Sequence, residues 1–166
     1  EARWNEPARR HPLFEGSEHP LNLNIGKIEG GDWASSVPAW CKIDCRIALY
    51  PDRKAADASA EIEQVVRDAC RADRYLSNRP AEVVWNGFHA EGFVLEPGSE
   101  AEAVLGRAHE AVFKTKLEAR TATAYLDARV YALFDGIPAL NYGCIAESYH
   151  GYNERVNLAS VEKCTA

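Results

Sequence analysis

The sequence predicts an α/β protein in two parts, a small α+β sandwich followed by a segment in which helices and strands alternate. Residues 21–28 alternate apolar and polar side chains, which indicates a half-buried strand, and residues 37–49 continue as a second strand. Residues 54–74 carry apolar side chains at helical spacing. From residue 99 onward, helical and strand patterns take turns, as they do in domains built on a parallel sheet.

The first part is expected to contain an antiparallel hairpin, because a glycine-rich turn at residues 29–32 joins its two strands. The second strand has an apolar residue at every other position, so these residues share one face: Cys41, Ile43, Cys45, Ile47 and Leu49. A third strand is expected at Ala81–Trp85. Strand, strand, helix and strand together describe a small sandwich over residues 20–86.

The composition changes at residues 96–99, where Glu-Pro-Gly-Ser interrupts the pattern. We therefore predict one domain at residues 1–92 and a second at residues 93–166. Ser99 can cap a helix over residues 100–116, because its hydroxyl can accept a bond from a free backbone N–H of the first turn.

The remainder of the second part continues the alternation. Residues 121–123 suggest a short strand or turn, and residues 127–134 a helix that ends at Gly136. An apolar strand at residues 137–142 then leads toward His150. This part is too short to form a complete α/β domain by itself.

His150 is the most informative single residue, because it opens a polar turn after an apolar strand. In open α/β sheets ligands collect beyond the carboxyl ends of the strands, so a histidine there is a candidate metal ligand or general acid and base. One histidine cannot hold a metal, and no other His, Cys or acidic residue has obvious ligand spacing. Either residues outside this chain complete the site, or His150 is an ordinary polar loop residue, which spacing alone favours.

The composition argues against several functional classes. The chain has 166 residues, 46% of them hydrophobic and 27% charged, which are values of a folded protein rather than a disordered one. A net charge of −6 argues against a nucleic-acid partner. No stretch approaches the ~20 apolar residues of a membrane span, and no signal peptide is visible, so no membrane association is expected.

The five cysteines are odd in number and form no Cys-x-x-Cys pair. Cys41 and Cys45 face the same side of a strand but lie too far apart to bridge. A reduced, cytoplasmic protein is the simplest interpretation.

Both ends suggest a piece of a larger protein. Residues 1–5 resemble the last turns of a helix stopped by Pro7, and residues 158–162 begin a new helix close to the end of the chain.

Several segments resemble the family of metal-dependent deacylases that includes acetylornithine deacetylase, succinyl-diaminopimelate desuccinylase, aminoacylase and the glutamate carboxypeptidases. Residues 24–33 and 36–41 resemble the hairpin of that family's lid domain. The Asp127-Ala128-Arg129 segment, Gly136–Ala139, Tyr142-Gly143 and residues 150–156 resemble, in order and spacing, the end of its catalytic domain. The resemblance covers nearly the whole chain.

The resemblance implies a lid and dimerisation domain at residues 1–92 and the C-terminal part of a mixed-sheet catalytic domain at residues 93–166. It implies a site for two zinc ions, or cobalt in their place, with His150 as the final histidine ligand. Paired metals polarise an amide carbonyl and lower the pKa of a bridging water. The other ligands and the general base belong upstream of residue 1, so no catalytic residue is expected within this chain, and the fragment itself is expected to be inactive.

Substrate contacts are also implied by the resemblance. Arg46 resembles the lid arginine that grips a substrate carboxylate, although it follows Pro38 by eight residues, about two fewer than in many relatives. Arg129 matches an arginine of the catalytic domain, and Ser36, with Ser35, stands where relatives carry a polar contact. For both arginines the alternative is a structural or solvated charge. Cys144 stands where proline is usual after Tyr-Gly.

The sequence therefore predicts a zinc-dependent amidohydrolase, acetylornithine deacetylase-like, that removes an acyl group from the nitrogen of an amino acid. The implied partners are a small N-acyl amino acid and a second copy of the chain bound through the lid. Two alternatives remain. One is a non-catalytic dimerisation module, and the other is a carboxypeptidase or dipeptidase on the same scaffold.

Overall fold

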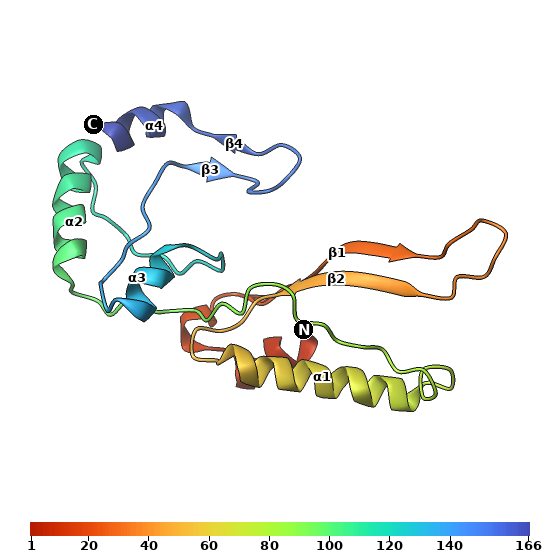
Figure 1. Ribbon diagram of the computed structural model, residues 1–166. Coiled ribbons are helices and arrows are strands. Elements are labelled where there is room, and N and C mark those ends of the chain that lie inside the picture. The colour runs from red at the N-terminus through yellow and green to blue at the C-terminus, as the bar shows by residue number, and fades with distance from the viewer. The chain divides into compact units, whose positions relative to one another are not determined.

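The computed structural model describes residues 1–166, which form two compact units (Figure 1). The first unit is Glu1–Gly92 with Thr121–Tyr125, and the second is Phe93–Arg120 with Leu126–Ala166. Helices and small sheets occur in both, which confirms the predicted α/β class. None of the helices is long and apolar enough to cross a membrane.

An antiparallel hairpin of β1 (Leu23–Gly30) and β2 (Cys41–Ile47) dominates the first unit, as predicted. A β-bulge at Gly26 shifts the register, so that Ile25 lies opposite Cys45 while Lys27 lies opposite Asp44. The sequence explains the bulge. Apolar residues of β1 stand at 23, 25 and 28, and the one extra residue returns Ile28 to the apolar face, opposite Ile43.

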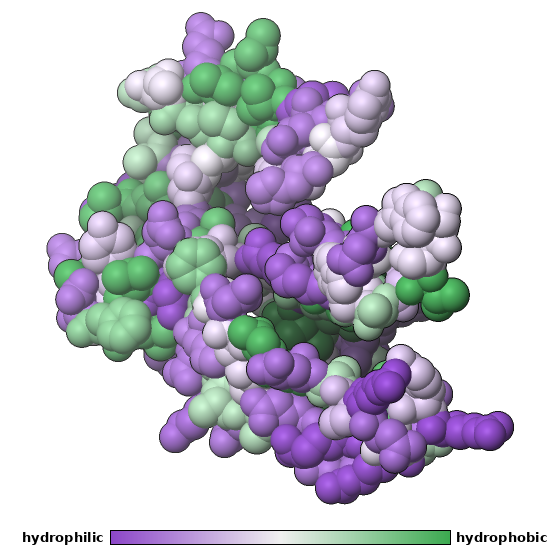
Figure 2. Space-filling model, turned by 45° about the vertical axis from the view of Figure 1, so that its right-hand side comes forward, coloured by the Kyte–Doolittle hydropathy of each residue, from purple (hydrophilic) through white to green (hydrophobic).

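The two faces of the hairpin differ in chemistry. One face carries the apolar residues of both strands, and Ile28 and Ile43 remain 67% and 54% exposed there. The other face carries a charged ladder, in which Lys27 pairs with Glu29 and Lys42 lies 3.4 Å from Asp44. Green apolar side chains reach the surface at several places in Figure 2.

Helix α1 (Ala55–Ala72) runs below the hairpin in Figure 1 and supplies part of the core of the first unit. The core consists of four buried residues: Trp4, Leu21, Tyr50 and Ala58. The helix ends at Asp73, whose carboxylate accepts hydrogen bonds from the N–H groups of Tyr75 and Leu76, both at 2.8 Å. Those two hydrogen bonds favour a non-helical turn at this point and oppose continuation of the helix.

Short 3-10 turns replace the α-helical turns expected at the start of the chain: η1 (Ala2–Asn5), η2 (Pro7–Arg9) and η3 (Pro12–Phe14). The buried Asn5 fastens this segment to the residues before β1. Its amide nitrogen donates to the Leu21 carbonyl at 2.7 Å, and the Leu21 N–H donates to its oxygen at 3.0 Å. One side chain thus satisfies both backbone groups of a buried residue.

In the second unit, α2 (Glu100–Phe113) begins as predicted, with a capping box. The Ser99 hydroxyl accepts from the Glu102 N–H at 3.2 Å, and the Glu102 carboxylate accepts from the Ser99 N–H at 2.9 Å. The helix ends at Phe113 rather than at residue 116, because Lys114 adopts a left-handed conformation with φ 58°.

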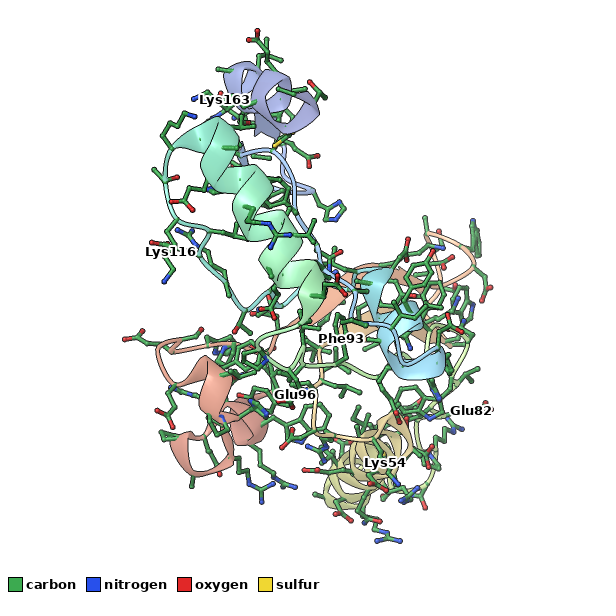
Figure 3. The ribbon with its side chains drawn as sticks, turned by 90° about the vertical axis from the view of Figure 1, so that its left-hand side faces the viewer. Lys54, Glu82, Phe93, Glu96, Lys116 and Lys163 are labelled. Carbon is green, nitrogen blue, oxygen red and sulfur yellow. The ribbon has the colours of Figure 1, made fainter.

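The rest of the second unit consists of α3 (Ala128–Phe134), the short hairpin β3 (Ala146–Glu147) and β4 (Arg155–Val156), and α4 (Leu158–Thr165). Gly136 follows α3 with φ 64°, which confirms the predicted helix end. Helix α4 lies beside the end of α2. There the ammonium of Lys163, labelled in Figure 3, is 5.4 Å from the ring centroid of Phe113.

Two predicted strands are absent. Residues 81–85 and 137–142 have strand-like composition but join no ladder. The two sheets contain only β1 with β2 and β3 with β4. A strand needs a partner for its backbone groups, and neither segment finds one among the described residues. The first unit is therefore a two-stranded hairpin with a helix rather than a three-stranded sandwich.

Candidate functional site

His150 lies in the loop of residues 148–154 that joins β3 to β4. The residue is exposed and has φ 58°, a left-handed conformation that few non-glycine residues adopt. Gly151 completes the turn, and its N–H donates to the Ser148 carbonyl at 2.7 Å. A Cβ on Gly151 would lie 2.8 Å from that same oxygen, so the position next to His150 requires glycine.

The hairpin that carries His150 is bonded to α4. The Asn157 N–H donates to the Ile145 carbonyl at 2.8 Å, and the Ile145 N–H donates to the Ser160 hydroxyl at 2.9 Å. Ser160 is only 4% exposed, and the Asn157 side chain caps the helix by accepting from the Ser160 N–H at 3.0 Å. Both ends of the β3–β4 hairpin are thus held at the start of α4, while the loop itself is exposed to solvent.

The chain alone does not complete a metal site. No group of three His, Cys, Asp or Glu side chains lies close enough to hold a metal ion. His150 offers one imidazole, and a zinc site needs three or four protein ligands. Any metal held by His150 would therefore need further ligands from other residues.

Arg129 lies in the first turn of α3, directly after the predicted Asp127-Ala128 pair. Its guanidinium is 5.9 Å from the ring centroid of Phe134, and the residue is half-buried. Asp127 occupies the N-cap position of α3 without a side-chain capping bond. Its charge is nevertheless at the helix end where the macrodipole favours it.

An open depression of about 410 Å³ lies in the second unit. It is lined by Leu126, the residues from Leu140 to Cys144, and Tyr149, the neighbour of His150. The Tyr142 hydroxyl is 2.8 Å from Nδ1 of His109. Burial raises the pKa of Tyr142, and the nearby Cys164 thiol adds to the rise.

Arg46 and Ser36 lie in the first unit, toward opposite ends of the hairpin. Arg46 is exposed on the charged face, opposite Asn24 and one residue before the end of β2. Ser36 lies in the connecting loop, where its hydroxyl donates to the Trp33 carbonyl at 3.0 Å. The structure does not bring these two residues together. Arg46 and Ser36 of one hairpin therefore cannot both contact the same small group of a substrate.

One cluster was not predicted from the sequence. Cys144, Cys164 and Tyr142 come from two separate segments of the second unit, and their side chains interact. The sequence could have indicated this cluster only indirectly. Cys164 stands four residues after Ser160, on a helix of which the sequence predicted only the beginning.

Comparison with known proteins identifies relatives of both parts of the chain. Residues 4–74, which include the hairpin and α1, match the family model of the peptidase dimerisation domain. This segment of the chain is therefore similar to the dimerisation domain of the peptidase and deacylase family that the sequence motifs resemble. Succinyl-diaminopimelate desuccinylase of Afipia carboxidovorans is 26% identical over 93% of this chain, and that of Rhodopseudomonas palustris strain BisB18 is 28% identical over 93%. The enzyme of Cereibacter sphaeroides strain ATCC 17029 is 26% identical over 99% of the chain.

The aligned region is a minor part of each relative. The chain spans 39% of the Afipia protein and 42% of the Cereibacter protein. The match to these relatives extends through both structural units, beyond the dimerisation domain itself.

Proposed function

We propose that the intact protein containing this chain is a metal-dependent amidohydrolase that removes an N-acyl group from an amino acid. The observation that carries the proposal is the match to desuccinylases along 93% of the chain, which includes the hairpin of Arg46 and the loop of His150. The relatives are named for a succinyl group, whereas the sequence motifs alone suggested an acetylornithine deacetylase-like enzyme. Succinyl and acetyl amino acids are therefore both candidate substrates.

In this proposal His150 is a zinc ligand. Its loop is exposed, its left-handed backbone is held by the bond between Gly151 and Ser148, and the hairpin that carries the loop is bonded to the start of α4. A neutral imidazole suits zinc, which accepts nitrogen and oxygen ligands. When bound, the metal would supply an activated water for attack on the amide.

The proposed substrate contacts are Arg46, Arg129 and Ser36. A guanidinium can hold a carboxylate through two parallel hydrogen bonds, and both arginines are candidates for the carboxylate of the amino acid. Ser36 would contribute a hydroxyl from the loop of the hairpin. The exposure of Arg46 on the charged face leaves its guanidinium accessible to a ligand.

The metal assignment is tested in the intact protein by His150→Ala. We expect the variant to lose one zinc per subunit and most of its amidohydrolase activity while remaining folded, because the residue lies in an exposed loop. Elemental analysis and circular dichroism measure the two properties. Tyr152→Ala is the matched control, since Tyr152 is exposed in the same loop. A fully loaded, active His150 variant would disprove the assignment.

Arg46 is tested by kinetics with two kinds of substrate. If Arg46 binds the carboxylate, Arg46→Ala should lower kcat/KM by about 1.5–3 kcal/mol on N-acyl amino acids, as for a charge-assisted hydrogen bond. Substrates with an amidated carboxyl group should be nearly insensitive. Lys42→Ala, which removes a charge from the same face, should change neither. Equal losses on both substrates would show that Arg46 is structural.

The match to a dimerisation domain supports a second proposal, in which the first unit associates with a second copy of itself. The edge of β1 has no partner in the chain, and few charges protect it. Light scattering should detect a twofold dimer at micromolar concentration. Ile28→Pro removes a backbone donor from β1 and should weaken the dimer, whereas Val37→Pro in the connecting loop should not. A strictly monomeric intact protein would contradict the proposal.

A carboxypeptidase or dipeptidase on the same scaffold remains the enzymatic alternative. A screen of N-acetyl, N-formyl and N-succinyl amino acids against dipeptides separates the two. Hydrolysis of dipeptides alone would replace the amidohydrolase proposal.

A further inference from the structure

Two cysteines from separate segments meet in the second unit. Cys144 lies in the segment that leads into β3, and Cys164 lies in the last turn of α4. Both are free and half-buried, and the Cys144 thiol contributes to the raised pKa of Cys164, as expected for neighbouring side chains. The Cys164 thiol likewise contributes to the raised pKa of Tyr142, whose side chain is therefore a neighbour.

A backbone hydrogen bond independently explains why the segments of the two cysteines lie side by side. The Ile145 N–H donates to the Ser160 hydroxyl at 2.9 Å, which fixes the residue after Cys144 against the first turn of α4. Cys164 follows Ser160 by four positions and therefore projects from the same face of the helix, one turn further along. The bond that docks this segment on α4 thus brings the two thiols to one side of the helix.

The surroundings distinguish the two sulfur atoms. Cys144 lines the open depression beside Tyr149, where a small molecule can reach it. Burial raises the pKa of Cys164, and the Cys144 thiol adds to the rise, so Cys164 holds its proton more firmly than an ordinary thiol. The Tyr142 hydroxyl lies 2.8 Å from Nδ1 of His109.

We propose that Cys144 and Cys164 form a reversible disulfide by exchange with a low-molecular-weight disulfide such as oxidised glutathione. The assignment of a redox modification site goes beyond the proposed hydrolase activity and does not depend on it. Access favours Cys144 as the thiol that reacts first and Cys164 as the thiol that resolves the mixed disulfide.

The exchange balances without a further reactant. The Cys144 thiolate attacks one sulfur of the small disulfide, the S–S bond breaks, and one small thiolate leaves and takes up a proton. The Cys164 thiol then gives its proton to solvent and attacks the Cys144 sulfur, and the second small thiolate leaves. Two protein thiols lose two electrons in total, and one small disulfide is reduced to two thiols.

The bond would enclose β3, β4 and the whole His150 loop within a covalent ring that closes on α4. Cross-linking restricts the unfolded state of the enclosed segment, so the oxidised form should unfold at a higher temperature. The disulfide should also slow backbone hydrogen exchange in β3 and in the last turn of α4.

The test uses the full chain incubated in glutathione buffers from reducing to oxidising. Remaining thiols are alkylated with a maleimide, and the products are analysed by intact mass and by peptide mapping without reductant. The reduced chain should take up label on all five cysteines once unfolded. The oxidised chain should lose two sites, and the peptides of Cys144 and Cys164 should be joined. Reduction should restore both sites.

Two sets of variants sharpen the result. Cys144→Ser or Cys164→Ser should abolish the intramolecular bond. Cys41→Ser with Cys45→Ser should leave it intact, because these two cysteines lie in the other unit and, four residue steps apart on a strand, are separated by about 13 Å and cannot form a bond of their own. Peptide mapping of the unmodified chain decides the question even if a serine variant unfolds. Five labelled thiols in the most oxidising buffer, joined peptides other than 144 with 164, or a glutathione adduct that persists on Cys144 would each overturn the proposal.

Discussion

Ser160→Ala should loosen the hairpin that carries His150. The Ser160 hydroxyl accepts from the Ile145 N–H at 2.9 Å and donates to the Asn157 carbonyl at 2.6 Å, in a residue only 4% exposed. Removing the oxygen leaves the Ile145 N–H without its partner, which costs about 1–3 kcal/mol. Alanine is the better helix former by up to about 0.7 kcal/mol, so the expected net loss is about 1–2 kcal/mol.

Hydrogen exchange measures this loss where it occurs. The Ile145 amide should exchange about 5- to 30-fold faster in the variant, because a difference of 1.4 kcal/mol is tenfold in an opening equilibrium. The amides of α1, in the first unit, should not change. Thr165→Ala is the matched control, since its exposed hydroxyl donates to backbone carbonyls of the same helix. Unchanged protection at Ile145 would refute the reasoning that this one bond fastens the hairpin to α4.

Three further substitutions test the packing of each unit. Arg53 holds the pKa of Glu61 below its ordinary value of 4.5, so this ion pair stabilises the fold above pH 4.5 and its contribution is lost as the pH falls through the lowered folded pKa. Glu61→Gln should therefore lower stability in urea unfolding at about pH 7 and make much less difference at about pH 3. Tyr50→Phe should be neutral or stabilising by up to about 1 kcal/mol in thermal unfolding, because the buried hydroxyl has no hydrogen-bond partner, and a clear destabilisation would show that it has one. Ser99→Ala should destabilise α2 by about 1 kcal/mol while Ser99→Asp should not, since an aspartate can still cap the first turn, and equal unfolding midpoints for the two variants would count against the cap.

The elements predicted correctly are those whose signals are local. The alternation in β1, the apolar spacing of α1 and the capping residue Ser99 each lie within a few residues of the structure they specify. The strands expected at residues 81–85 and 137–142 depended on a partner elsewhere, and composition alone cannot supply one. The bulge at Gly26 was readable in principle, because the apolar positions of β1 depart from strict alternation exactly once.

The candidate site shows the same limit. The sequence located His150 in a polar turn after an apolar segment, and the structure shows that turn between two short strands. The sequence could not predict which residues hold this turn in place. The hydrogen bonds from Ile145 to Ser160 and from Asn157 to Ile145 join residues that only the folded chain brings together. The proposed link between Cys144 and Cys164 depends on the same bond from Ile145 to Ser160, so the sequence alone could not predict it. The substitutions of His150 and Arg46 described above test the roles proposed for those two residues.

The bulge at Gly26 also bears on how this hairpin can change length during evolution. Ile25 and Lys27 lie opposite two adjacent residues of β2, Cys45 and Asp44, so Gly26 is the one residue of β1 that has no directly opposite residue in β2. Loss of that codon would leave every remaining cross-strand pair intact and return the ladder to a regular one. Loss of a codon further from the bulge would move the residues between the gap and Gly26 onto the wrong face. Homologous hairpins that differ by one residue in this strand should therefore have gained or lost it at Gly26 or directly beside it.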